Sequence, residues 1–250
     1  MELSCRGLHL VKGTQRLEWW GRLFRAFSIL LLVLVAVCLE GCGGSDPGRG
    51  TQSLYVEAHV TSDEAGATRV RVQVRDGDGR GRIEEAAVVR VRGHEEGEWV
   101  LDFEGRDWGP FAGGFHLLEG LEWQRGWHLE VEVGEEHWLE AYLEMPGLCT
   151  IIEPAADVTY RRGDGFPLVA RWEDSQRRHS RSIQVELNRN DYSVRLPGDV
   201  FRHEIASSVF RRDGGERLTV QRWNEVELLG GTIGSSFRGA TFCSVDFRVD

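Results

Sequence analysis

The sequence lacks an apolar run long enough to cross a bilayer. Its longest hydrophobic stretch, residues 26–39, has 14 positions and is interrupted only by Ser28. At about 1.5 Å per residue, a helix of this length falls short of a hydrocarbon core that needs about 20 residues. Lysine is nearly absent too, because Lys12 is the only one and arginine supplies the other basic side chains. The short run argues against a transmembrane helix, and we draw no function from the arginine bias.

The sequence also lacks the short motifs of common enzyme classes. It has no pair of histidines at the spacing of a zinc protease, no phosphate-binding loop, no dinucleotide fingerprint and no glycine-framed nucleophile. Acid–histidine neighbours such as His203–Glu204 are adjacent on predicted strands and point to opposite faces. We therefore expect a non-enzyme without metal or cofactor. A hydrolase whose site assembles from distant residues is the alternative.

One stretch partly matches a calcium-binding loop. In residues 76–87, Asp76 and Asp78 occupy ligand positions of an EF-hand, but Arg80 and Ala87 stand where two other ligands belong. The flanking residues have a strand pattern, so we predict a hairpin turn here and no metal site.

Acidic charge is concentrated in the first half of the chain. Residues 52–147 hold 21 acidic side chains and 9 arginines, whereas residues 148–250 hold 15 of each. A surface this acidic repels the phosphates of nucleic acids and the headgroups of anionic lipids, so we expect neither as a direct partner of this half. The charge could attract cations or basic proteins, or it could serve only as a solubilising surface.

The N-terminal segment has the pattern of an export signal that ends in a cysteine. Basic residues precede the short apolar run, and small residues follow it. The run ends in Leu39-Glu40-Gly41-Cys42, which resembles the lipobox of bacterial lipoproteins. In that family the cysteine thiol is acylated and the signal is cut just before it. The resemblance therefore implies a signal peptide of residues 1–41 and lipidation, such as palmitoylation, at Cys42.

The residues around this cysteine also bear on location. Glu40 departs from the small or apolar residue usual in the lipobox. Gly43 is not the aspartate that retains enteric lipoproteins at the inner membrane, so the resemblance implies the outer membrane of a bacterial cell envelope. The glycine-rich residues 42–51 predict a flexible tether. An uncleaved signal anchor and a secreted protein with an accidental cysteine are the alternatives.

Beyond the tether the hydrophobic pattern has a period of two. Leu54, Val56, Ala58 and Val60 share one face of the first such segment, and polar residues occupy the other face. The same alternation recurs through both halves of the chain, in segments separated by glycine-rich or charged turns. This pattern predicts half-buried antiparallel strands, and no segment after the tether shows a long helical period.

We therefore predict an all-β fold with two tandem antiparallel β-sandwich domains. Pro146-Gly147 separates the two series of strands, which places an acidic domain at 52–147 and a second domain at 148–250. The segments "PLVARW" and "IQVEL" resemble early strands of immunoglobulin-like or fibronectin-type domains, with Trp172 as the buried tryptophan. In the first half, "VRDGDGRGRIEEAAVVRV" resembles the hairpin of prealbumin-like or immunoglobulin-like modules.

Two cysteines follow the lipobox, Cys149 and Cys243. Export favours oxidation, and the two residues open and close the second predicted domain, so a disulfide between them is one prediction. Two buried thiols are the alternative.

Aromatic residues are the remaining candidates for a ligand site. Trp108 and Trp123 lie in glycine-rich, charged segments and could stack on a ligand, although packing roles are the alternative. Taken together, the sequence predicts a cell-envelope lipoprotein that acts as a non-catalytic binding or structural module. Its predicted partners are the membrane, through the lipid anchor, and a protein or carbohydrate. An extracytoplasmic hydrolase and a carbohydrate-binding accessory protein are the alternatives.

Overall fold

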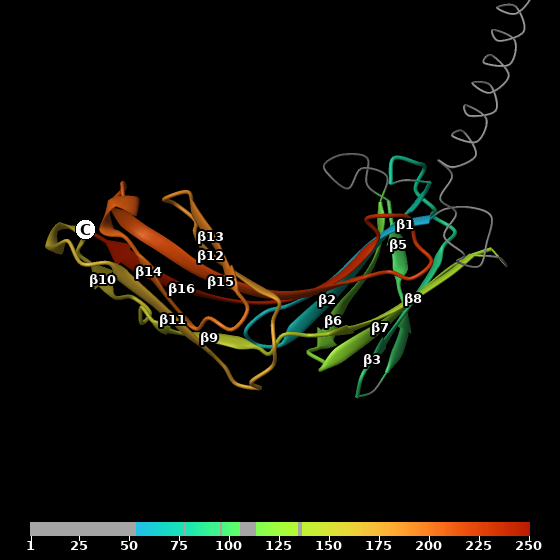
Figure 1. The fold of residues 1–250 in the computed structure, drawn as a ribbon, viewed down its shortest axis with the longest axis horizontal. Coiled ribbons are helices and arrows are strands. Elements are labelled where there is room, and N and C mark those ends of the chain that lie inside the picture. The colour runs from blue at the N-terminus through green and yellow to red at the C-terminus, as the bar shows by residue number, and fades with distance from the viewer. Residues whose placement is uncertain (1–53, 78, 96, 106–113, 135–136) are drawn as a thin grey trace, which may run out of the picture. The chain divides into compact units, whose positions relative to one another are not determined.

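Strands make up almost all of the regular structure in the computed structural model (Figure 1). The structure describes residues 54–250 except 78, 96, 106–113 and 135–136. The predicted signal peptide, the tether and Cys42 lie outside the described residues, and so does Trp108. In the described part, the helical elements are two short 3-10 turns, Arg162–Asp164 and Ser207–Val209, and no helix is long and apolar enough to cross a membrane.

The first half of the chain forms strands where the sequence alternates. β1 is buried at every second residue along its whole length, because successive side chains of a strand point to opposite faces. The strands of this half are β1 (Leu54–Ser62), β2 (Ala67–Asp76), β3 (Val88–Gly93), β4 (Glu98–Val100), β5 (Asp102–Glu104), β6 (Phe115–Glu122), β7 (Gly126–Val133) and β8 (His137–Glu144).

The second half continues the same pattern and ends in two long strands. The strands of this half are β9 (Cys149–Glu153), β10 (Thr159–Tyr160), β11 (Leu168–Asp174), β12 (Ser182–Leu187), β13 (Tyr192–Pro197), β14 (Arg202–Ile205), β15 (Gly214–Glu227) and β16 (Ser236–Val249).

These strands form three sheets. The largest has the order β13-β12-β15-β16-β1-β2-β6-β5, with β10 also paired to β16. The other two have the orders β14-β11-β9 and β4-β3-β7-β8. The prediction of an all-β fold is confirmed, with one departure from purely antiparallel pairing. β1 and β10 both run parallel to β16, which is possible because long connections separate these strands in the sequence.

Two hydrophobic cores lie between facing sheets. In the first, β1 and β2 of the large sheet pack against β3, β7 and β8 of the four-stranded sheet, with Val56, Val72 and Leu129 fully buried. In the second, β12, β15 and β16 pack against the three-stranded sheet, and Trp172 and Ile183 are among its buried residues. Trp172 is only 1% exposed, as expected for the buried tryptophan of an immunoglobulin-like sandwich.

The two long strands β15 and β16 contribute to both cores. They pair along their full length, from Gly214 opposite Val249 to Glu227 opposite Ser236. Phe237, near one end of β16, is buried in the first core, although it lies in the range predicted for the second domain. The described residues belong to one compact unit, and the division into domains at residue 147 stays a prediction.

A buried ion pair holds the segment that connects the two halves. Arg222 Nη1 lies 2.7 Å from Asp174 Oδ2, and the two side chains are 0% and 1% exposed. Arg222 also donates hydrogen bonds to the carbonyl oxygens of Gly147 and Arg178, at 3.1 and 2.7 Å. Thr241 Oγ1 donates to the same Gly147 oxygen at 2.9 Å. The start of the second half is therefore fixed to β15 and β16 through buried polar contacts.

Asp78 of the stretch that partly matches a calcium loop lies outside the described residues, and the residues on either side of it form a turn after β2. The backbone N–H of Asp76 donates to the carbonyl of Arg82 at 2.9 Å, and Arg75 bridges Ile83 in antiparallel fashion. The chain then leaves the large sheet, because β3 pairs with β7 and β4 rather than with β2. The predicted hairpin is thus limited to the turn itself.

Candidate binding site

The outer face of the four-stranded sheet carries a row of polar and aromatic side chains. The pairing register places Glu98 of β4 opposite Arg92 of β3, Arg92 opposite His128 of β7, and His128 opposite Tyr142 of β8. The neighbouring residues along these strands, such as Val91 and Leu129, are buried in the first core. Strict alternation therefore turns this row away from the core.

The Tyr142 ring occupies space next to Gly126, a residue that has no side chain. A Cβ atom at Gly126 would come within 2.5 Å of the Tyr142 hydroxyl oxygen, so glycine is required for the ring to occupy this place. The Tyr142 and His128 rings lie 4.6 Å apart between centroids, at a tilt of 42°. The Tyr142 hydroxyl is also 3.3 Å from His94 Nδ1. These contacts bring His94, His128 and Tyr142 into one cluster.

Backbone contacts hold the β3–β4 turn against this cluster. The N–H of His94 donates to the carbonyl of Gly126 at 2.9 Å, and the N–H of Glu95 donates to Gln124 Oε1 at 3.2 Å. Gly97 has a φ of +92°, and a Cβ there would meet the ring of Trp99 at 2.1 Å. The turn is therefore shaped by Gly97 and fixed to the beginning of β7.

The β3–β4 turn and the strands β3, β4 and β7 border a shallow hollow that is open to solvent. Its volume is about 380 Å³, and it is lined by Arg92, Gly93, His94, Glu95, Gly97, Glu98 and His128. We call Arg92, His94, His128 and Tyr142 the His–Tyr site. The lining carries a guanidinium, two imidazoles and two carboxylates, so it offers both hydrogen-bond donors and acceptors at neutral pH.

The environment of His128 favours its neutral form. Burial lowers the pKa of this imidazole, and the nearby charges of Arg92 and His94 lower it further, against a smaller opposing effect of Glu130 and Glu140. A neutral imidazole presents one donor and one acceptor nitrogen and keeps an aromatic face. The site is therefore suited to contacts through ring faces and directed hydrogen bonds.

The titratable groups in the lining of the site are histidine, arginine and glutamate side chains. Its lining contains no serine, threonine or cysteine that could act as a nucleophile. Within the described residues, no group of three or more His, Cys, Asp or Glu side chains has the arrangement of a metal site. What the geometry provides is a fixed set of polar and aromatic contacts on a sheet face.

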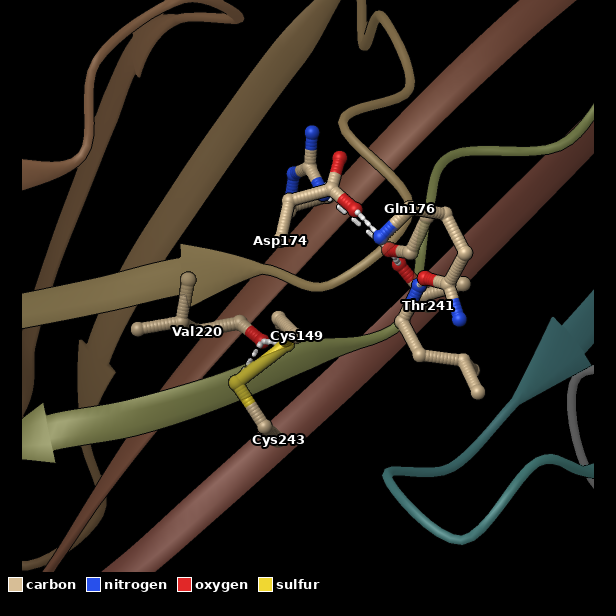
Figure 2. The surroundings of a disulfide bond; sticks show 9 residues. Cys149, Asp174, Gln176, Val220, Thr241 and Cys243 are labelled. Atoms are coloured by element: carbon tan, nitrogen blue, oxygen red, sulfur yellow. Dashed lines mark hydrogen bonds and ion pairs between the residues drawn. A yellow bond between two sulfur atoms is a disulfide. The ribbon is translucent and has the colours of Figure 1, made fainter.

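Of the residues singled out from the sequence, the two cysteines are brought together. Cys149 and Cys243 form a disulfide with a Cα–Cα distance of 5.6 Å, which confirms the predicted bridge (Figure 2). The bridge lies in the second core, since both cysteines are 1% exposed. Figure 2 shows Asp174, Gln176 and Thr241 close to it, so the disulfide and the buried ion pair brace the same region.

Trp123 has a packing role in the structure. It is half-buried, contacts the first core, and donates its indole N–H to the carbonyl of Pro146 at 3.1 Å. Its role in ligand stacking stays a prediction, as does that of Trp108, which lies outside the described residues. Lipidation of Cys42 stays a prediction for the same reason.

Sequence reasoning missed the His–Tyr site because its members come from separate strands. In the sequence, Arg92 simply alternates with apolar residues, and His94 is simply followed by a glutamate. The useful signal was the outward position of His128 and Tyr142 in two alternating segments. Which strands lie side by side, however, depends on sheet pairing that the sequence does not show.

Comparisons with known proteins give no family. No family model matches the chain, and no curated protein matches it. One solved structure similar to it is a biofilm-associated protein, BSP domain, with 13% identity over 78% of this chain and a TM-score of 0.25. The chain spans 29% of the length of that protein.

Two further similar structures contain immunoglobulin domains. DIP-gamma IG1+IG2 matches 76% of this chain and 97% of its own length, with 10% identity and a TM-score of 0.23. Dpr11 IG1 bound to DIP-gamma IG+IG2 matches 80% of this chain and 98% of its own length, with 9% identity and a TM-score of 0.24. At these scores the likenesses carry no argument, so the chain's own sheets define it as an all-β protein.

Proposed function

We propose that the protein is a lipid-anchored, non-catalytic binding module of the bacterial cell envelope that contacts a protein partner through the His–Tyr site. The observation that carries the proposal is the row of Arg92, His128 and Tyr142, fixed by strand register and open to solvent on a sheet face. Side chains held on strands are positioned more rigidly than side chains on loops, which favours a binding role.

The residue types of the site support a protein partner. Tyrosine and arginine are enriched at protein interfaces and often supply a large share of the binding energy. Tyr142 is preorganised by Gly126 beneath it and by His128 and His94 beside it, so little rotational freedom remains to be lost on binding. The surrounding acidic surface of the first half would favour a partner with a basic face.

The anchor is the second part of the proposal. Cys42 would be acylated and would become the new N-terminus, and residues 42–51 would give the folded body a flexible connection to the outer membrane. In cells that process lipoproteins, Cys42→Ser should leave an uncut precursor or a product that is no longer membrane-bound. Normal cutting and membrane attachment of Cys42→Ser would contradict the anchor.

The binding role can be tested with a photo-crosslinking residue at position 95, which lines the hollow beside the site, in the wild-type background and in Tyr142→Ala. We expect a covalent adduct to one protein of the envelope in the wild type and a loss of most of that adduct in Tyr142→Ala. The matched control places the crosslinker at Arg69, an exposed residue of β2 whose ion pair with Glu119 lies on the other sheet. That position should give no such adduct.

Three outcomes would contradict the binding role. They are no protein adduct from position 95, an adduct that Tyr142→Ala leaves unchanged, and equal adducts from positions 95 and 69. An adduct to a saccharide in place of a protein would reject the protein partner in favour of a carbohydrate ligand at the same site.

A further inference from the structure

Two large aliphatic side chains stand out from the loop that joins β15 to β16. Ile233 is 101% exposed and Leu229 is 78% exposed, whereas their neighbour Leu228 is 5% exposed and belongs to the first core. Exposure of single apolar residues is common, but these two lie four positions apart in the same short loop. The loop, residues 228–235, therefore presents a small apolar surface to solvent.

The loop is held in this shape by hydrogen bonds. The N–H of Thr232 donates to the carbonyl of Leu54 at 2.8 Å, and Thr232 Oγ1 donates to the carbonyls of Leu54 and Gly77, both at 3.1 Å. At the other end, Ser235 Oγ accepts from the N–H of Val56 at 3.1 Å. The exposed positions of the two aliphatic residues are thus fixed by the fold.

The loop is also free of charge, although it packs against the strongly acidic first half of the chain. No Asp, Glu, Lys or Arg occurs from Leu228 to Phe237, between Glu227 and Arg238. An uncharged apolar loop avoids the cost of bringing carboxylates close to lipid headgroups or into an apolar layer. The absence of charge distinguishes the loop from the acidic first half against which it packs.

The position of the loop indicates what covers it. Its anchoring partner Leu54 is the first residue of β1, and Cys42 precedes Leu54 by twelve positions in the sequence. A flexible, glycine-rich tether of this length has a root-mean-square span of roughly 20 Å. If Cys42 carries lipid, the end of the body that contains the loop stays close to the bilayer surface.

Trp138 lies at the same end of the first half. It is 40% exposed and stands near the start of β8, two positions before Glu140, which forms a backbone bridge with Leu229. Tryptophan is favoured at the boundary between headgroups and hydrocarbon, where its ring meets both environments. An aromatic and two aliphatic side chains therefore face outward from the end of the body that follows the tether.

We propose that the loop 228–235 is a membrane-contact loop, in which Leu229 and Ile233 enter the headgroup region of the phospholipid surface that holds the lipid anchor. This proposal rests on the anchor at Cys42 described under the proposed function. The contact gives the body a preferred orientation on the bilayer, with the loop against the lipid. The His–Tyr site lies at the other end of β7 and β8, near Gly126 and Glu144, and so remains accessible to a partner.

The test uses the full chain, expressed and processed as a lipoprotein, with the substitution Ile233→Cys. A fluorophore sensitive to polarity is attached to the new thiol, because Cys149 and Cys243 form a disulfide and Cys42 is acylated under the proposal. The protein is placed in vesicles of phosphatidylethanolamine and phosphatidylglycerol that contain a lipid spin-labelled near the top of its acyl chain. We expect quenching at position 233 at least about twofold stronger than at a solvent-exposed control site.

Phe166→Cys is the matched control. Phe166 is also a large apolar residue and is 73% exposed, but it lies between β10 and β11. β10 pairs with the last residues of β16, whereas the loop precedes the first residue of β16. The strand spans about 40 Å at roughly 3.3 Å per residue, so a probe at Phe166 reports on the end away from the tether. A second variant adds Leu229→Asp to Ile233→Cys and should reduce the quenching to the level of Phe166→Cys.

The outcomes separate this inference from the anchor. If the labelled protein fails to float with the vesicles, the anchor is wrong, and the loop contact is overturned with it. If the protein floats but quenching at positions 233 and 166 is equal, the anchor stands and the membrane-contact loop is overturned. Shielding of position 233 that needs native envelope proteins and is absent in pure lipid vesicles also overturns it, in favour of a protein contact.

Discussion

Breaking the buried ion pair between Arg222 and Asp174 should be among the most destabilising single changes in the second half. Arg222→Met removes the guanidinium and leaves a carboxylate that is 1% exposed without its charged partner. It also removes donors from the buried carbonyl of Gly147 and from that of Arg178. Removing one member of a buried pair costs about 3–5 kcal/mol, because the remaining charge keeps its desolvation penalty.

A substitution of the other member, Asp174, distinguishes the contribution of the ion pair from that of the hydrogen bonds around it. Asp174→Asn removes the charge but keeps one side-chain oxygen that can accept from the N–H of Gln176 or of Arg178, as the carboxylate does now at 2.9 and 2.7 Å. We expect a smaller loss for this variant than for Arg222→Met. The double variant should lose less than the sum of the two, by about 1–3 kcal/mol, since the groups contact each other.

The free energy of unfolding can be measured by urea titration with tryptophan fluorescence, because Trp172 in the second core is 1% exposed and reports on its packing. The matched control is the ion pair of Arg217 and Asp246, which also lies on β15 and β16 and has the same 2.7 Å separation. Its side chains are 54% and 64% exposed, so Arg217→Met should hardly shift the urea midpoint. Losses that add without coupling, or a loss for Arg222→Met as small as for Arg217→Met, would refute the reasoning.

Two further predictions concern the disulfide and the acid sensitivity of the fold. The bridge between Cys149 and Cys243 spans 94 positions, so its reduction should lower the free energy of unfolding by about 4–5 kcal/mol, measured by urea titration with and without reductant. Stability should also fall between about pH 7 and pH 5, because burial lowers the pKa of His116 in the folded state and the unfolded chain then binds more protons. The thermal midpoint should fall less steeply in His116→Gln than in the wild type as the pH is lowered across this range.

Each of these two predictions has its own control. The double variant Cys149→Ser/Cys243→Ser should not respond to reductant, and an equal response of this variant and the wild type would show that the effect arises elsewhere. His116 is 2% exposed and contacts Phe103, so the substitution changes packing and shifts the thermal midpoint at every pH. The quantity to compare is therefore the slope of the thermal midpoint against pH. An identical slope in His116→Gln would contradict the assignment.

Under these proposals, the membrane-contact loop and the His–Tyr site make different contacts from opposite ends of the first half. The loop 228–235 lies beside the start of β1, where the chain continues toward the predicted tether. The His–Tyr site lies at the opposite end of β7 and β8, beside the segment that leads into the second half. A module arranged in this way would hold one end on lipid and offer the other to a partner.

The amino-acid sequence alone was sufficient to predict the strands and the all-β class. Alternation at Leu54, Val56, Ala58 and Val60 is a local property, because successive side chains of a strand point to opposite faces whatever the partner strand is. The disulfide between Cys149 and Cys243 could also be predicted, because the predicted export favours oxidation and the two cysteines open and close the second half. These features depend on residue order and composition.

Tertiary structure alone decided how the strands combine. The parallel pairing of β1 with β16 joins segments far apart in the sequence, and it makes Phe237 part of the first core although the residue lies in the second half. The buried pair of Arg222 and Asp174 has no local signature, because each residue reads as a surface charge until both are enclosed. The His–Tyr site and the exposed loop follow the same rule. Whether these side chains are buried, paired or exposed depends on which strands pack around them. No local pattern of residues determines that packing.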